Sequence, residues 1–316
     1  MQKVQTRRIV ETGFLTAIIV VIAMLGATVP MLGFIGSIFV PVTVAVAGVR
    51  NGVRWSASAV IAAFLLLSFF IGPILALITM GTFGLLGISI GHGIVSGWRP
   101  AKLLLLPSVI VFASSVLQLF GGFYLMNIDY MRMWDDVKAQ SMAQVVEVYA
   151  AQGYEGERLT AMADMMRWQM EYTGYALAVL LFAGAIFSTY LVCLFADKIL
   201  ARLNLMRVYM PSLDKWQMPS WTLYMFVSGA LMIYWGHTRE IEVLRYLGGN
   251  LSVLGVLMLT VEGLACLAAL AVAFNLQVWM RWAMIIALLM FMPITIPVFG
   301  AMDLLINYRE KLRGNR

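Results

Sequence analysis

The chain has 316 residues, of which 62% are hydrophobic and 12% are charged, and its formal net charge at pH 7 is +6. Soluble domains carry about 25% charged residues, so this composition excludes an ordinary soluble domain and predicts a protein that crosses a membrane several times. The positive charge does not indicate nucleic-acid binding, because most basic residues lie in short segments beside apolar runs, as the cytoplasmic ends of membrane spans do.

Nine apolar runs are each long enough to cross a bilayer, which needs about 20 helical residues. Because the first four are joined by very short connections, they predict a compact up-and-down bundle. The last run contains Pro293 and Pro297, which indicate a broken or re-entrant segment. We therefore predict an all-α polytopic membrane helix bundle with 8 to 9 transmembrane segments. The runs cover 13–30, 32–49, 53–71, 73–95, 103–127, 172–196, 220–236, 246–273 and 282–302.

Charge predicts the orientation of these runs. Basic residues precede the first run and follow the second, fourth and sixth, whereas the connections after the first and third carry no charge. By the positive-inside rule the N-terminus is cytoplasmic. Nine crossings would place the basic residues from Arg309 to Arg316 outside, so we prefer eight full crossings with a cytoplasmic tail, in a bacterial inner membrane.

The run at 73–95 is rich in glycine, which costs a helix about 1 kcal/mol per residue relative to alanine in water. Gly84, Gly87 and Gly91 stand at positions i, i+3 and i+7 and form one smooth stripe. Close backbone contact is a main source of helix association in lipid, so this stripe predicts a packing centre. A hinge or unwound binding segment, as in some transporters, is the alternative.

Residues 128–171 differ from the rest of the chain, because they hold eight acidic and four basic side chains. This excess of acid places the segment outside the cytoplasm. Apolar residues at helical spacing on both sides of the sequence QGYEG at 152–156 predict a pair of amphipathic helices. Two interpretations remain open: a lid over an outward cavity, or a helical hairpin that lies at the membrane interface.

Four polar residues are candidate contacts for a bound solute. Glu262 stands halfway through the run at 246–273, where an ionised acid costs several kcal/mol unless it faces the bundle interior, pairs with a cation or a donor, or carries a proton. Gln118 is a weaker case of the same kind. Asn127 and Asp129 could line an outward cavity or cap a helix, and Glu262 and Gln118 could serve packing alone.

The sequence contains no pattern typical of an enzyme. It has no phosphate-binding GxxxxGK[ST] loop, so a partner ATPase or an ion gradient would have to drive any transport. His92 and His237 end different spans, and Cys193 and Cys266 lie in apolar runs. We therefore expect no catalytic site, no metal site and no cofactor.

Several motifs carry a resemblance to a known family. VPMLGF at 29–34, VAGVRNG at 46–52 and the glycine-rich sequence at 72–93 resemble the YybS family of bacterial membrane proteins. So do WQMPSW at 216–221, EGLACL at 262–267 and GAMDLLINYREK at 300–311, where Asp303, Asn307 and Arg309 resemble the aspartate-then-arginine ending of that family.

That family is similar, over its first six spans, to the substrate-binding S components of energy-coupling factor transporters. The resemblance implies a six-span S-component-like core at 1–197 that includes the amphipathic insertion at 128–171, followed by membrane helices and a basic tail at 198–316. S components carry paired alanines near the start of the first span for docking on a coupling membrane subunit, and Gly13 and Ala17 stand at that place here.

We expect a lipid-embedded protein that binds, and helps to move, a small solute in an outward-facing cavity. The alternative is a membrane scaffold that transports nothing and docks partner proteins through the basic loop at 197–219 or the tail. Several converging polar groups inside the bundle would favour the first, and a dry core in which one neighbour satisfies Glu262 would favour the second.

Overall fold

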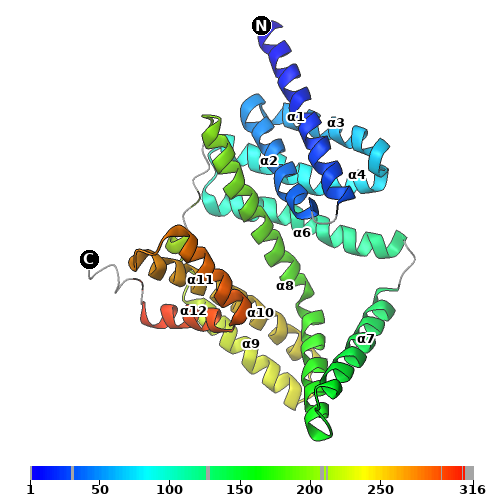
Figure 1. Ribbon diagram of the computed structural model, residues 1–316, viewed down its shortest axis with the longest axis vertical. Coiled ribbons are helices and arrows are strands. Elements are labelled where there is room, and N and C mark those ends of the chain that lie inside the picture. The colour runs from blue at the N-terminus through cyan, green and yellow to red at the C-terminus, as the bar shows by residue number, and fades with distance from the viewer. Residues whose placement is uncertain are drawn as a thin grey trace. The chain divides into compact units, whose positions relative to one another are not determined.

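The regular elements of the computed structural model are helices, as the sequence predicts (Figure 1). The structure describes residues 2–29, 32–125, 129–206, 210, 213–292, 294–307 and 309, and no strand occurs among them. Its helices are α1 Gln2–Thr28, α2 Gly33–Asn51, α3 Val53–Ile71, α4 Pro73–Thr79, α5 Leu85–Val95, α6 Pro100–Leu125, α7 Tyr130–Ala151, α8 Glu157–Arg202, α9 Trp221–Thr238, α10 Glu242–Ala273, α11 Val278–Phe291 and α12 Thr295–Ile306, together with a π-helical turn η2 Met80–Gly84 and a 3₁₀ turn η3 Leu213–Lys215.

Seven of the predicted spans coincide with helical segments long and apolar enough to cross a bilayer. The predicted run at 220–236 forms α9, which is not one of the seven. Seven of the predicted eight to nine spans are therefore supported. The seven segments are Gln5–Thr28, Gly33–Asn51, Val53–Ile71, Pro73–Val95, Pro100–Gly121, Leu177–Arg202 and Glu242–Ala273.

The predicted break in the run at 282–302 is confirmed, because α11 ends at Phe291 and α12 begins at Thr295. Pro297 falls in the first turn of α12, where its missing N–H costs no hydrogen bond, since the first N–H groups of a helix have no partner within the helix. Two short apolar helices therefore replace one long span.

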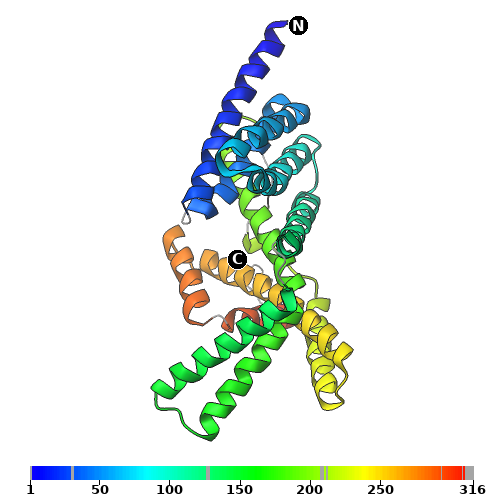
Figure 2. The same cartoon turned by 90° about the vertical axis from the view of Figure 1, so that its right-hand side faces the viewer.

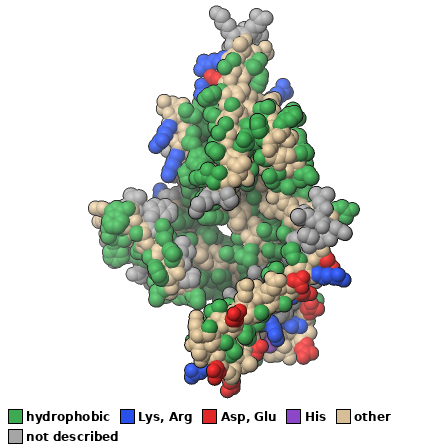
Figure 3. All heavy atoms as spheres, turned by 45° about the vertical axis from the view of Figure 1, so that its right-hand side comes forward, with side chains coloured by type: hydrophobic (Ala, Val, Ile, Leu, Met, Phe, Trp, Pro, Cys, Tyr) green, Lys and Arg blue, Asp and Glu red, His purple; other side chains and the backbone are tan. Residues whose placement is uncertain are grey.

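The helices expose many large apolar side chains, as the lipid-facing surface of a membrane protein does. Phe69 is 85% exposed and Leu117 is 74% exposed, although both lie inside long apolar helices. Hydrophobic side chains cover much of the face seen in Figure 3. Such a surface is unsuited to water, which supports embedding of the chain in a bilayer.

The chain forms two compact units. Unit 1 comprises Met1–Ile128 and Leu181–Met210, and unit 2 comprises Asp129–Leu180 and Pro211–Arg316. Helix α8 is one continuous helix whose N-terminal part belongs to unit 2 and whose C-terminal part belongs to unit 1. The division predicted from the resemblance, 1–197 and 198–316, stays a prediction.

In unit 2, α7 and the first part of α8 form the two arms of a helical hairpin (Figures 1 and 2). The turn between them contains Gly153 and Gly156, both with positive φ, and the rings of Tyr149 and Tyr154 meet edge to face at 5.4 Å. This hairpin is the pair of amphipathic helices that the sequence predicts. Whether it acts as a lid or lies at the membrane interface stays open.

Helix α2 is the centre of unit 1, with α1, α3 and α5 packed around it. Polar contacts join the first half of α1 to the end of α2, because Glu11 accepts hydrogen bonds from Arg7 and from Arg50, both at 2.9 Å. The buried Asn51 side chain donates to the hydroxyl of Thr12 at 3.2 Å. These contacts fix the register of α1 against α2.

The glycine stripe of the fourth span faces neighbouring backbone in unit 1. A Cβ added at Gly87 would lie 2.5 Å from the carbonyl oxygen of Pro41 in α2, and one at Gly91 would lie 3.0 Å from that of Ala45. A Cβ at Gly84 would lie 2.6 Å from the Val60 side chain in α3. The same span is interrupted by the π-helical turn η2, so close contact and local irregularity occur together in it.

We expect Gly87→Leu to destabilise the protein by at least about 3 kcal/mol, the upper end of overpacking costs, because the new side chain has no space beside α2. Fluorescence-detected thermal melting in mild detergent measures this effect. The control is Gly184→Leu, since a Cβ at Gly184 meets nothing within 4 Å. Unchanged melting and yield for Gly87→Leu would show that the stripe does not hold α5 against α2.

Candidate functional site

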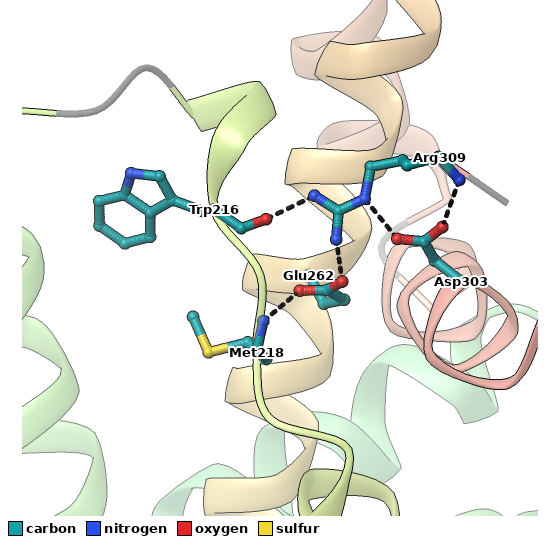
Figure 4. A network of polar contacts seen from close by, with 5 residues as sticks. All are labelled: Trp216, Met218, Glu262, Asp303 and Arg309. Atoms are coloured by element: carbon teal, nitrogen blue, oxygen red, sulfur yellow. Dashed lines mark hydrogen bonds and ion pairs between the residues drawn. The ribbon is translucent and has the colours of Figure 1, made fainter. Parts of the chain in front are cut away.

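Glu262 lies deep inside unit 2, where it is 1% exposed in the middle of α10. One carboxylate oxygen, Oε2, accepts the backbone N–H of Met218 at 2.6 Å. The other, Oε1, accepts a hydrogen bond from Nη2 of Arg309 and forms an ion pair with it (Figure 4). The structure therefore gives this acid both a cation and a donor, which are the partners that an acid in an apolar span requires.

Arg309 joins three separate segments of the chain. Its Nε donates to Asp303, its Nη1 to the backbone carbonyl of Trp216, and its Nη2 to Glu262. The guanidinium is planar and always charged, and its N–H donors point in fixed directions. One arginine side chain can therefore bind several acceptors at once. Figure 4 shows it between α10, α12 and the segment that contains Trp216.

Asp303 holds Arg309 in place from the last turns of α12. Its Oδ1 accepts the backbone N–H of Arg309 at 3.1 Å while its Oδ2 accepts Nε of the same residue. A carboxylate near the C-terminus of a helix is disfavoured by the helix dipole, and the guanidinium offsets that cost. Asp303 is 4% exposed, so its charge also needs this partner.

The turn after α12 explains how Arg309 reaches back to Asp303. Asn307 adopts a left-handed conformation with φ of +50°, and its N–H donates to the Asp303 carbonyl at 2.8 Å. Asparagine tolerates this conformation better than most residues, because its short polar side chain bonds locally. The spacing of Asp303, Asn307 and Arg309 thus produces a helix end that folds its cation back toward its acid.

Glycines bring α10 and α12 into backbone contact beside the network. A Cβ at Gly263 would overlap the carbonyl oxygen of Ile296, and a Cβ at Gly300 would overlap that of Leu259. Gly263 follows Glu262 directly, and Gly300 lies one turn before Asp303. Only glycine at these positions allows the two acids to approach a common guanidinium.

The segment at 216–219 contributes backbone groups rather than side chains. It lies between η3 and α9, outside regular helix, although the Trp216 N–H donates to the Leu213 carbonyl and the Pro219 carbonyl accepts from the Thr222 N–H. Backbone N–H and C=O groups in an apolar environment need partners, and Glu262 and Arg309 provide them for Met218 and Trp216. Pro219 favours an extended conformation for the residue before it, which helps to direct the Met218 N–H at the carboxylate.

Two acids and one guanidinium make the network formally −1 when both acids are ionised. Each buried ion costs several kcal/mol to desolvate, so the excess charge favours uptake of a proton or of a positively charged group. Each of the four carboxylate oxygens accepts a hydrogen bond from the chain. A carboxylate oxygen has two acceptor sites, so the network retains capacity to accept more donors.

The other sequence candidates do not join this network. Gln118, in unit 1, donates to the Thr82 hydroxyl in η2 at 2.6 Å. Asp129 is exposed and accepts the N–H of Arg132 at 3.3 Å, as a residue that caps the start of α7 does. Asn127 lies outside the described residues. Gly13 and Ala17 are exposed on α1, one helical turn apart.

Sequence reasoning singled out Glu262 but missed that Arg309, Asp303, Trp216 and Met218 surround it. A signal was present for Asp303, because residues 246–307 contain only two acids, Glu262 and Asp303. Rare charges in apolar sequence indicate a shared role, but the one cation in that range is Arg281, so the pattern does not point to Arg309. Within the part of the chain that the structure describes, no group of three or more His, Cys, Asp or Glu side chains is arranged to hold a metal ion.

A family model described as "Predicted membrane protein (DUF2232)" matches residues 17–304. No match was found among curated proteins or among solved structures. The matched region includes Glu262 and Asp303 and stops short of Arg309.

We expect Arg309→Met to destabilise unit 2 by about 3–5 kcal/mol, because it leaves two buried carboxylates without their cation. Thermal melting in detergent measures the loss. The double variant Glu262→Gln/Arg309→Met should recover part of it, since fewer unpaired charges remain. Arg239→Met, at an exposed arginine, is the control. Equal melting of Arg309→Met and the wild type would show that the ion pair does not hold the unit together.

Proposed function

The chain belongs to the DUF2232 family of predicted membrane proteins, and we propose that it is a multi-pass membrane subunit that binds a small solute or ion and assists its passage across the bilayer. In this proposal the Glu262–Arg309–Asp303 network is the polar centre of the solute site. The protein has no ATPase and no catalytic role of its own.

The buried network in α10 is the observation that carries this proposal. Glu262 lies within Glu242–Ala273, one of the seven segments able to cross a membrane. Ionisable groups inside a bilayer are costly and are retained mostly where they serve substrates, ions or protons. Because both acids and the arginine are nearly inaccessible to water, a role in surface solubility does not account for them.

The interrupted helices next to the network support the same role. α12 begins after the break that follows α11 and packs against α10 through Gly300 and Gly263. Transporters often form their sites near the midplane from discontinuous helices, whose irregular backbone is tolerated only where protein or a cavity surrounds it. The extended segment at 216–219 is a second irregular stretch at the same network.

The charge of the network indicates the class of solute. A formal charge of −1 favours a proton, a monovalent cation or a solute with an ammonium group. Such a group could use the acceptor capacity that remains on the carboxylates of Glu262 and Asp303. It would neutralise the excess charge without displacing Arg309.

The finer parts of the proposal rest on the sequence resemblance. They are a six-span S-component-like core at 1–197, a bacterial inner membrane location with the N-terminus in the cytoplasm, and energy from a partner ATPase through a coupling membrane subunit. The exposed Gly13 and Ala17 on α1 would form the docking face for that subunit, because small residues allow close approach of another helix.

One observation favours a second candidate, a membrane scaffold that docks partner proteins and moves no solute. Nε, Nη1 and Nη2 of Arg309 each donate to an acceptor of the chain itself. A network satisfied in this way can act as an internal clamp that fixes 216–219 and the end of α12 against α10. In that case Glu262 serves stability alone.

Mass spectrometry of small molecules that co-purify in mild detergent separates the two candidates. The comparison is between the wild type and Glu262→Gln, which removes the charge with little change in shape. Glu242→Gln is the control, since it removes an exposed carboxylate from the same helix. A species enriched at least tenfold with the wild type and with Glu242→Gln, and lost with Glu262→Gln, supports the solute site. No differential species at equal stability of all three proteins supports the scaffold.

A further inference from the structure

The positive charge of the protein belongs to unit 1. That unit holds ten lysines and arginines and two acidic residues, a net charge of +8, whereas unit 2 holds twelve and fourteen, a net charge of −2. The two values add up to the +6 of the whole chain. The excess is large for a unit that is otherwise apolar, and such charge beside membrane spans attracts anionic lipid.

The basic side chains of unit 1 lie at one end of its helices. Successive spans run in opposite directions. The N-terminal ends of α1, α3 and α6 therefore lie on the same side of the unit as the C-terminal ends of α2 and α5. The finish of α8 belongs there too, because Leu200 near its end shares a hydrophobic cluster with Leu103 near the start of α6. The described basic residues at this end are Arg7, Arg8, Arg50, Arg54, Arg99, Lys102, Lys198 and Arg202.

Most of these charges are not neutralised by the protein. Glu11 pairs with Arg7 and Arg50, but Arg54, Arg99 and Lys102 are exposed and form no ion pair with any described residue. Figure 3 shows blue side chains, with very little red, on the green surface around the N-terminal helix.

The Trp98 side chain is held in a fixed position at this end, between α5 and α6. Its backbone N–H donates to the Gly93 carbonyl at 2.9 Å, and its ring meets the His92 ring edge to face at 5.5 Å. A Cβ at Gly93 would lie 2.7 Å from the indole, so glycine is required to seat the ring there. Nζ of Lys102 lies 4.6 Å from the centroid of the same ring.

The surroundings of Trp98 have the composition of a boundary between acyl chains and headgroups. Leu105 and Leu106, which follow Lys102 by one turn in α6, are 48% and 44% exposed and can contact acyl chains. Tryptophan concentrates at the boundary between chains and headgroups. Arginine binds phosphate oxygens through two parallel hydrogen bonds, and lysine adds a compact positive charge.

We propose that this basic end of unit 1 is a binding surface for the phosphate headgroups of anionic phospholipids, with Trp98, Arg99, Lys102 and Arg54 as its contact residues. The surface acts independently of the solute site. A lipid explains the charges better than an acidic soluble protein does, because Lys102 lies one helical turn from the exposed Leu105 and Leu106 in α6.

Native mass spectrometry of the purified full-length protein tests the proposal. The protein in detergent is titrated with dioleoyl phosphatidylglycerol or with dioleoyl phosphatidylcholine, and bound lipids are counted. Each basic side chain near an anionic surface strengthens association about fivefold. We therefore expect at least fivefold more bound phosphatidylglycerol at low salt, and a decline of this preference as salt is raised, because salt screens the attraction.

The variant Arg54→Gln/Arg99→Gln/Lys102→Gln should reduce the lipid preference to less than twofold. The matched control, Arg132→Gln/Lys138→Gln/Arg158→Gln, removes the same charge from the α7–α8 hairpin and should retain the preference. Should the first variant fail to fold, the salt dependence of the wild type still decides. Equal binding of the two lipids by the wild type, or an unchanged preference in the first variant, overturns the proposal.

Discussion

The C-terminal half of the protein is organised by the need to pair a carboxylate that cannot reach water. Glu262 is held inside an apolar helix, so a cation and donors have to come to it from elsewhere in the chain. Arg309 supplies the cation, Asp303 positions Arg309, and the backbone N–H of Met218 supplies a further donor. One buried acid therefore determines where the end of α12 and the entry to α9 lie relative to α10.

Both units rely on the absence of side chains at chosen positions. In unit 1, Gly87 and Gly91 allow the backbone of α2 to approach closely. In unit 2, Gly263 and Gly300 allow the backbones of α10 and α12 to approach each other. Hydrophobic burial contributes little between helices in lipid, so the closeness of the backbones becomes the main source of attraction. In unit 2 this closeness also brings the charged side chains within reach, so that packing and electrostatics depend on the same two glycines.

The sequence was sufficient for the helical architecture, because runs of about 20 apolar residues have few alternatives to a helix in a membrane. It also identified Glu262, since an acid in such a run is conspicuous. It did not identify Arg309 as the partner, because that residue stands 47 positions further along and outside the apolar runs. The roles of Trp216 and Met218 were out of reach, since they act through backbone atoms that every residue shares. The π-helical turn at Met80–Gly84 was foreseen only as the alternative of a hinge or unwound segment, because glycine-rich sequence is also compatible with a regular helix and tertiary contacts decide between the two.

The order of Glu262 and Arg309 along the chain has a consequence for biosynthesis. Ribosomes add about 5–20 residues per second, so the 47 positions between them correspond to roughly 2–9 seconds. During this interval the translocation machinery has to handle α10 while its acid has no counter-ion. A protonated carboxyl group, or a chaperone that shields it, would keep the nascent helix in the bilayer until the last segment is made. Maturation of the protein thus has a waiting step that ends only when Arg309 emerges.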